Sequence, residues 1–385
     1  MESRPGAKKK CRRKLRGILV LEDGTILEGC GFGATGIRYG EIVFTTGMVG
    51  YPEALTDPSF RGQILVMTYP LIGNYGVPSR DLMIHGVPLH YESDRIQVEA
   101  FIVAYETMPS HWSSVISLHE WLRSEGIPGI SRIDTRFLVK KIREAGVMMA
   151  GVAVCEDEID PYSLLEGLRR VQRYDEIDFV SQVCPSTILI HEPPSARRTV
   201  ILLDLGVKYG ILRELLERGY RVIRAPPNVD IVSLYNEYDA SGIVVSNGPG
   251  NPSKLTRVVE SIRRCIVEGI PMLGICLGHQ LICMAMGAGI FKLKYGHRGQ
   301  NKPCIDLETG RCFVTSQNHG YAVDRSTLTN GLKVWMINAD DRTVEGVRHA
   351  SKPVIGVQFH PEASPGPLDS TWIFSLFEKV MEKWT

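Results

Sequence analysis

One cysteine stands between a short apolar run and a run with helical spacing. Residues 270–275 are typical of a buried parallel strand, and residues 277–286 carry apolar side chains at the spacing of a helix. Cys276 therefore falls at a strand-to-helix turn, flanked by Gly274 and Gly278, which allow a tight bend. A helix N-terminus favours a thiolate over a thiol. The pattern predicts a nucleophilic cysteine, the thiol counterpart of a nucleophile elbow.

Two other interpretations of this cysteine stay open at this point. A free cysteine at an apolar helix start is often a small core residue without any reactivity. Cys276, His279 and Cys283 also have the C-x2-H-x3-C spacing of metal ligands. A closed tetrahedral site needs a second pair of ligands. The sequence offers none nearby, so we predict no metal site here.

A thiolate nucleophile needs a base that moves protons, and the base needs a partner that fixes its orientation. His360 follows residues 355–359, which have the pattern of a strand. Glu362 comes two residues later, after a proline that stiffens the turn. We expect its carboxylate to hold one ring nitrogen of His360 while the other faces Cys276. A lone histidine is more often structural, so this interpretation depends on the cysteine.

A third strand end carries the sequence Gly248-Pro249-Gly250. Glycines here leave backbone N–H groups uncovered, which suits an oxyanion or a carboxylate, although Asn-Gly and Pro-Gly also mark ordinary turns. Sites in parallel sheets form at the carboxyl ends of the strands. Because all three segments end predicted strands, we expect them at one edge of a sheet.

The elements that must position these residues divide the chain in two. Strands and helices alternate beyond residue 199, which predicts a parallel sheet covered on both faces by helices. The half before it is mixed α and β with many Gly and Pro residues in its loops. We predict an α/β protein with a basic, disordered tail (1–16), an N-terminal α+β domain (17–183), a Pro-rich linker (184–198) and a C-terminal domain (199–385).

Composition excludes several classes of protein. The 385 residues are 44% hydrophobic and 23% charged with a formal net charge of +1, so neither nucleic acid nor membrane is indicated as a partner. No apolar run is long enough to span a bilayer and no secretion signal is visible, so we expect a cytoplasmic protein. Nine dispersed cysteines predict reduced thiols.

Three motifs resemble those of class I glutamine amidotransferases: GICLGHQ, SNGPGNP and GVQFHPE, together with an Asn-His-Gly element at 318–320. The N-terminal half sharpens this resemblance. Its segments TGMVGYPEALTDPSF and TYPLIGNYG are similar to those of the small chain of carbamoyl-phosphate synthetase. The resemblance covers nearly the whole chain except the basic tail. It implies the amidotransferase fold for residues 199–385.

The resemblance also implies an activity. L-Glutamine would be hydrolysed through a glutamyl thioester on Cys276, with His360 as acid and base and Glu362 as its orienting group. The oxyanion would lie between the backbone N–H groups of Leu277 and Gly250. The remaining assignments are substrate-binding residues for glutamine: Gly47, Gly248, Gly250, Leu277, Gln280, Asn318, Gly320 and Tyr321.

Two positions depart from the family pattern. Gly47 stands where the family usually has serine, so a hydroxyl expected near the substrate is missing. Tyr321 replaces a phenylalanine, which is a milder change. The family implies a large synthetase chain as partner, in a heterodimer or a higher oligomer of heterodimers. That chain would use the ammonia with bicarbonate and ATP for arginine and pyrimidine biosynthesis. ATP and magnesium are expected on the partner, and no cofactor is expected on this chain.

Two alternatives stay open from the sequence. The chain would instead be an amidotransferase subunit of another synthase, such as anthranilate synthase, if it purified with an enzyme that uses chorismate. It would be a catalytically silent assembly or regulatory subunit if the complex released no glutamate from glutamine. Gly47 in place of serine is the one sequence feature that favours the silent subunit.

Overall fold

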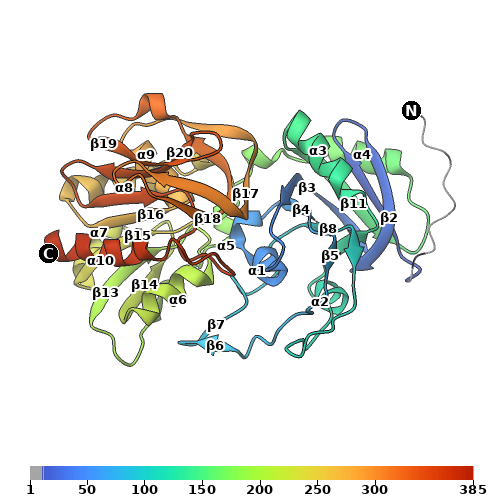
Figure 1. Ribbon diagram of the computed structural model, residues 1–385, viewed down its shortest axis with the longest axis horizontal. Helices are drawn as coiled ribbons and strands as arrows, with labels where there is room; N and C mark the ends of the chain where they lie inside the picture. The colour runs from blue at the N-terminus through green and yellow to red at the C-terminus, as the bar shows by residue number, and fades with distance from the viewer. Residues whose placement is uncertain (1–10, 12, 385) are drawn as a thin grey trace. The chain divides into compact units, whose positions relative to one another are not determined.

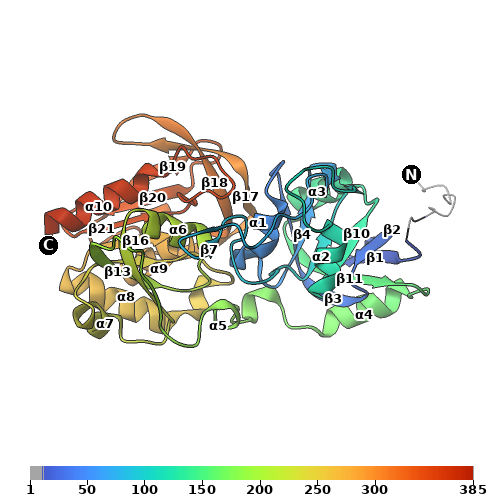
Figure 2. The same cartoon turned by 90° about the horizontal axis from the view of Figure 1, so that it is seen from below.

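The computed structural model describes residue 11 and residues 13–384 (Figures 1 and 2). The chain consists of two compact units. Unit 1 comprises Met1–Thr56, Gly62–Ser79 and Arg95–Tyr174. Unit 2 comprises Asp57–Arg61, Arg80–Asp94 and Asp175–Thr385. Two short segments from the N-terminal half therefore pack with the C-terminal unit.

Unit 1 is built on a closed barrel of seven strands in the order β1-β11-β3-β4-β8-β10-β2. Strand β1 pairs antiparallel with β2 in a hairpin, and Gly24 takes a positive φ at the turn. Closing the sheet leaves no unpaired strand edge. The strands are β1 Arg16–Leu21, β2 Ile26–Gly33, β3 Gly36–Thr45, β4 Gln63–Met67, β8 Ala100–Ile102, β10 Pro128–Ser131 and β11 Met148–Cys155. A separate two-stranded sheet pairs β5 Leu71–Ile72 with β9 Tyr105–Glu106.

Two helices of unit 1 begin at residues whose side chains cap them. Helix α2 (Leu118–Ser124) has a complete capping box between Ser117 and Glu120. Helix α3 (Thr135–Ala145) starts at Asp134, whose carboxylate accepts the N–H of Phe137. The remaining helices are α1 Tyr51–Thr56, α4 Pro161–Arg170 and the 3-10 turn η2 Tyr174–Glu176, whose last two residues belong to unit 2.

Unit 2 is organised around a ten-stranded sheet in the order β12-β14-β13-β15-β16-β21-β20-β19-β17-β18. The five strands from β14 to β21 are parallel, as the sequence predicts. Antiparallel strands extend the sheet on both sides. The bounds are β12 Leu189–His191, β13 Arg198–Leu203, β14 Tyr220–Ala225, β15 Ala240–Val245, β16 Met272–Ile275, β17 Ile290–Asp306, β18 Cys312–Val323, β19 Leu332–Asn338, β20 Val344–His349 and β21 Val354–Val357.

Helices cover both faces of this sheet, and each face has its own apolar core. Helices α6 (Tyr209–Glu217) and α10 (Trp372–Trp384) pack on one face. Helices α7 (Ile231–Glu237), α8 (Thr256–Glu268) and α9 (Leu277–Ala285) pack on the other. Figure 2 shows α10 and α8 on opposite sides of the strands. The shorter elements are η1 Pro58–Phe60, β6 Met83–Ile84, β7 Val87–Pro88, α5 Val180–Val183, η3 Pro252–Lys254 and η4 Arg325–Thr327.

The structure differs from the predicted organisation at three places. Residues 189–191 of the predicted linker form strand β12, which pairs with β14 as the outermost strand of the sheet. The division between the units falls after residue 174 rather than at 183. Most of the predicted tail lies outside the described residues. Its described part is attached, because Cys11 forms a disulfide with Cys30 and Arg13 pairs with Glu106 at 2.7 Å.

That disulfide contradicts the expectation that all nine cysteines are reduced. The two sulfur atoms join residues 19 positions apart within unit 1, while seven other cysteines are free thiols. The cysteine spacing does not indicate this disulfide, because a pairing between a tail and a barrel strand depends on the fold. Among the described residues, no helix has both the length and the apolar character that a bilayer crossing requires.

Candidate active site

Cys276 lies at the turn that the sequence predicts, between the end of β16 and the start of α9. Its φ of 53° is a left-handed conformation that non-glycine residues rarely adopt. The backbone N–H of Cys276 donates to Val357 O at 2.8 Å, which fixes the turn against β21. A Cβ atom added at Gly278 would lie 2.1 Å from Val245 O, so this flanking position accepts only glycine. The sheet thus holds the cysteine in a strained, defined position.

His360 and Glu362 form the pair that the sequence predicts. Strand β21 is the parallel neighbour of β16, with Val357 opposite Ile275, so His360 follows the adjacent strand end. Nδ1 of His360 lies 2.7 Å from Oε1 of Glu362, and both side chains are buried. Because a carboxylate only accepts, Nδ1 carries the proton. Nε2 is buried without a hydrogen bond of ordinary geometry to any described residue, so it is the ring atom available to the thiol.

The electrostatics of this pair favour an imidazolium next to a carboxylate. Burial lowers the pKa of His360, but the charge of Glu362 offsets this, and the thiol of Cys276 also contributes to a net rise. Burial raises the pKa of Glu362, yet Lys208 and His360 bring it well below its ordinary value. A protonated histidine beside a nucleophile can supply a proton to a leaving group.

Lys208 is a third buried charge that the sequence interpretation missed. Its Nζ lies 3.1 Å from Oε1 of Glu362 and donates to Ala363 O at 2.9 Å. Burial lowers the pKa of Lys208, but the charges of Glu362, Glu92 and Asp57 raise it above its ordinary value. Lys208 therefore stays charged and holds the carboxylate of Glu362 in place. A lysine between apolar residues just after strand β13 was the signal available in the sequence.

Three predicted substrate-binding side chains lie in unit 2 with partners of their own. Gln280 donates its amide to Tyr321 O at 2.9 Å and to Gln358 Oε1 at 3.0 Å. The backbone carbonyl oxygen of Asn318 lies 3.7 Å from the sulfur of Cys276, so strand β18 reaches the predicted nucleophile. The hydroxyl of Tyr321 donates to Asp175 at 2.5 Å. The structure thus brings the Asn-His-Gly strand to the predicted nucleophile.

Of the predicted backbone sites, Gly248 lies next to the start of α9. The N–H of Gly278 donates to Ser246 O at 3.0 Å, which joins the start of α9 to the segment that contains Gly248 and Gly250. A Cβ atom at Gly248 would lie 2.9 Å from a methyl carbon of Leu277 and 2.2 Å from Leu205 O. Gly250 has a φ of +89°. A Cβ atom at Gly320 would approach the side chain of Arg298 at 3.3 Å.

Gly47 belongs to unit 1, where its N–H donates to Thr45 Oγ1 at 3.3 Å. Its assignment to the glutamine site therefore stays a prediction from the sequence.

Asp57 and Ser59 are additional residues that the sequence interpretation did not single out. They lie in the short segment Asp57–Arg61, which belongs to unit 2. Asp57 accepts a hydrogen bond from the side-chain amide of Asn318 at 2.9 Å, and Ser59 accepts one from Asn247 at 2.9 Å. Both serine and aspartate are buried. This segment fixes the orientation of Asn318, a predicted ligand of glutamine.

Glu92 is a buried carboxylate that supports the loop after His360 and Glu362. It accepts hydrogen bonds from Arg213 at 2.6 Å, from Gly210 N at 2.9 Å and from the hydroxyl of Ser364. Ser364 follows Glu362 by two positions, so Glu92 anchors the residues that carry the predicted base. The sequence contained no local signal for this contact, since residues 92 and 364 are far apart along the chain.

His279 follows the cysteine on helix α9 and is fully buried. Burial lowers its pKa to about 3, so the folded protein holds it neutral while the unfolded chain protonates it near pH 6.5. Between these values the unfolded state binds more protons, and stability falls as the pH decreases. We expect the free energy of unfolding to lose about 3 kcal/mol from this residue between pH 6.5 and pH 4.

Urea unfolding of the His279→Gln variant at these two pH values measures this loss. The variant is expected to lose less stability on acidification than the wild type, because glutamine does not titrate. The exposed His85 supplies the control, and His85→Gln should follow the wild type. Equal acid sensitivity of His279→Gln and the wild type would contradict the buried neutral histidine.

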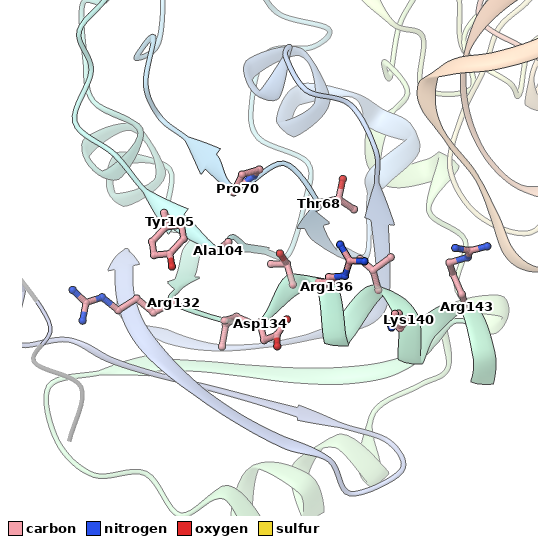
Figure 3. A pocket seen from close by; sticks show the side chains of 12 residues that line it. Thr68, Pro70, Ala104, Tyr105, Arg132, Asp134, Arg136, Lys140 and Arg143 are labelled. Atoms are coloured by element: carbon pink, nitrogen blue, oxygen red, sulfur yellow. The ribbon is translucent and has the colours of Figure 1, made fainter. Parts of the chain in front are cut away.

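Unit 1 contains a cavity of about 900 Å³ that is separate from these residues (Figure 3). Its lining is basic, with Arg132 before α3 and with Arg136, Lys140 and Arg143 on the helix itself. Figure 3 shows Arg136 and Arg143 projecting from the same side of α3. None of the predicted catalytic or glutamine-binding residues lines this cavity.

Comparison with known proteins shows the family to which the chain belongs. The family model "Glutamine amidotransferase class-I" matches residues 201–380, and "Carbamoyl-phosphate synthase small chain, CPSase domain" matches residues 19–152. The chain is 56% identical over 367 residues to the carbamoyl phosphate synthase small chain of Pyrococcus furiosus, covering 95% of this chain and 98% of that protein. It is 49% identical over 374 residues to the one of Sulfurisphaera tokodaii, with 97% and 98% covered. The chain belongs to the family of carbamoyl-phosphate synthase small chains.

Proposed function

We propose that the chain hydrolyses L-glutamine and passes the ammonia to a large synthetase chain. The observation that carries the proposal is the meeting of Cys276 with the buried pair His360 and Glu362 at adjacent strand ends. A lone buried cysteine would need no such pair. The similarity to small chains over nearly the whole sequence supports the same activity.

The proposed reaction has two halves. The thiolate of Cys276 attacks the side-chain carbonyl carbon of glutamine, and His360 gives its proton to the departing nitrogen, so ammonia leaves and a glutamyl thioester remains. His360, now neutral, takes a proton from water, which attacks the thioester and releases glutamate and the thiol. Glu362 keeps Nδ1 protonated, so that Nε2 is the atom that moves the proton in both halves.

The oxyanion of both steps would be held by the backbone N–H groups of Leu277 and Gly250. Leu277 begins helix α9, and the first N–H groups of a helix lack acceptors within it. Such donors act where charge develops in the transition state, and each contributes about 2.7–4 kcal/mol in other hydrolases. The closeness of Gly248, two residues before Gly250, to the side chain of Leu277 supports this pairing.

We infer that the remaining site residues recognise the amino-acid end of glutamine. An ammonium group needs acceptors and a carboxylate needs donors. The acceptors for the ammonium group would be carbonyl groups of strand β18 and the side chains of Asn318 and Tyr321. The donors for the carboxylate would be backbone N–H groups of the glycine segments. Gly47 offers a backbone N–H but no hydroxyl, and we propose that glutamine binding relies on the groups of unit 2.

The partner would be the large synthetase chain, which uses bicarbonate, ammonia and ATP. We place ATP and magnesium on that chain, because the hydrolysis above needs no cofactor. The complex would be a heterodimer or a higher oligomer of heterodimers in the cytoplasm. Its product would serve arginine and pyrimidine biosynthesis.

Release of glutamate from glutamine tests the proposal. We expect the chain together with its large partner to release glutamate well above an uncatalysed control, and the chain alone to be slower if the partner orders the site. Absence of release from the assembled complex would favour the silent subunit instead. Co-purification with a chorismate-using enzyme would contradict the proposed partner.

A further inference from the structure

Three side chains with metal-binding atoms meet inside unit 2, and none of them is a residue of the proposed Cys276, His360 and Glu362 chemistry. His297 on β17, His319 on β18 and Glu345 on β20 are all buried. One nitrogen or oxygen atom from each lies within 4.8 Å of the other two. We propose that these three residues bind a zinc ion, with water in the fourth position.

The two histidines are each held by one ring nitrogen, which leaves the other for a ligand. Nε2 of His297 lies 2.9 Å from Oδ2 of Asp341, so it donates to a carboxylate. Nδ1 of His319 lies 2.8 Å from the carbonyl oxygen of Tyr321, so it donates there. Metal-binding histidines usually donate their second nitrogen to a carboxylate or a backbone carbonyl in this way. Nδ1 of His297 and Nε2 of His319 are therefore the atoms that would bind the metal, with a bound cation replacing any proton on them.

The two carboxylate oxygens of Glu345 also differ, because one has a hydrogen-bond partner and the other has none among the described residues. Its Oε1 accepts a hydrogen bond from Asn338 at 2.9 Å, while its buried Oε2 has no hydrogen-bond partner among the described residues. Nδ1 of His297 is likewise buried without a hydrogen bond there. Leaving such buried polar atoms unpaired is unfavourable. One cation between them satisfies both.

The distances are compatible with zinc after a small adjustment. Donor atoms around a tetrahedral zinc lie about 3.3 Å apart, given Zn–N and Zn–O bonds of about 2.0–2.2 Å. Nδ1 of His297 lies 3.8 Å from Oε1, the other oxygen of the same carboxylate, and one donor atom from each of the three residues lies within 4.8 Å of the other two. The set of two histidines and one carboxylate, with an oxygen or nitrogen from every ligand, suits zinc better than calcium or magnesium.

A second arrangement competes for the same atoms. Oε1 of Gln317 lies 3.4 Å from Nε2 of His319, and a rotated amide would donate to that nitrogen. His297, if protonated, would pair with both Asp341 and Glu345. These contacts describe a buried hydrogen-bond network without a metal, and they predict no zinc affinity. A measurement of zinc affinity therefore distinguishes the zinc site from the hydrogen-bond network.

The proposed zinc would stabilise the strand that carries a predicted glutamine ligand. His319 is adjacent to Asn318, whose carbonyl oxygen contacts the sulfur of Cys276. Binding at His319 would join β17, β18 and β20 on the antiparallel side of the sheet. The site does not depend on glutamine hydrolysis, so its test can fail while the proposed activity stands.

Zinc binding to the full-length chain tests the site. The experiment uses the Cys276→Ala background, so that the nucleophile cannot bind metal, and starts from protein cleared of metal with a chelator. We expect one zinc per chain by calorimetry and a higher unfolding temperature with zinc. Cobalt in place of zinc should give the visible bands of a tetrahedral site without a thiolate charge-transfer band.

Substitutions of the cluster residues test which side chains bind the zinc. Glu345→Gln and His297→Gln should each weaken zinc binding at least about 100-fold, and Asp341→Asn about 10-fold. His85→Gln, which removes an exposed histidine outside the cluster, should bind like the parent. Circular dichroism confirms that each variant is folded. No zinc binding by the parent, equal binding by folded Glu345→Gln, or a thiolate band with cobalt would overturn the proposal.

Discussion

The Cys276→Ala variant is expected to lose glutamine-dependent activity by at least about 10⁴-fold while the complex still uses free ammonia. Removal of a nucleophile eliminates the covalent route, and losses of this size follow when residues act as a unit. The carbonyl of Asn318 and the elbow backbone would remain in place, so glutamine binding should change little. Glutamate release and ammonia-dependent product formation by the assembled complex measure the two activities side by side.

Cys283 is the matched control for this variant. It lies on the same helix, is fully buried and contacts the apolar cluster around Leu332 and Val344 instead of the site. Cys283→Ala should retain glutamine hydrolysis within a few fold, with a modest stability loss of about 1 kcal/mol for the missing sulfur. Retained glutamine-dependent turnover in Cys276→Ala would show that the reaction does not use this thiol.

The Lys208→Met variant is expected to lose both stability and activity. Its ammonium shares the carboxylate of Glu362 with His360, and all three groups are buried. Removing one partner of a buried ion pair costs about 3–5 kcal/mol, because a buried charge loses its compensation. Methionine has a similar length, so a cavity does not explain the loss. Urea unfolding at neutral pH measures it.

The pH profile of the same variant separates catalysis from stability. The charge of Lys208 lowers the pKa of His360, so its removal raises that pKa further. Thioester hydrolysis needs His360 neutral, and a higher pKa means a smaller neutral fraction at each pH. The rise of the rate with pH should therefore move to a higher pH in Lys208→Met. An unchanged profile would indicate that Lys208 acts through packing alone.

The double variant Lys208→Met/Glu362→Gln tests whether the two charges act together. If they compensate each other, the double variant loses less free energy of unfolding than the sum of the single variants. Neutral side chains of similar size then replace both members of the pair. Strict additivity of the two losses would mean that Lys208 and Glu362 stabilise the fold independently.

Sequence alone was sufficient for the parts of the site that depend on local order. The strand before Cys276, the helix after it and the two glycines beside it are neighbours along the chain, so their pattern determines the turn. His360 and Glu362 are two residues apart, and the proline between them restricts the backbone. The alternation of strands and helices likewise predicts parallel pairing, which brings the ends of β16 and β21 to one edge.

Only the tertiary structure could reveal the groups that reach the site from distant parts of the chain. Lys208 lies 154 positions before Glu362, and Asp57 reaches Asn318 across 261 positions. A charge that lacks a partner is costly when it is buried. Whether it is buried depends on the residues that the whole fold packs around it. The barrel of unit 1, the antiparallel strands β17–β20 and the pairing of Cys11 with Cys30 depend on the same long-range contacts. Local periodicity determines where strands and helices form, whereas their partners are fixed by packing among residues far apart in sequence.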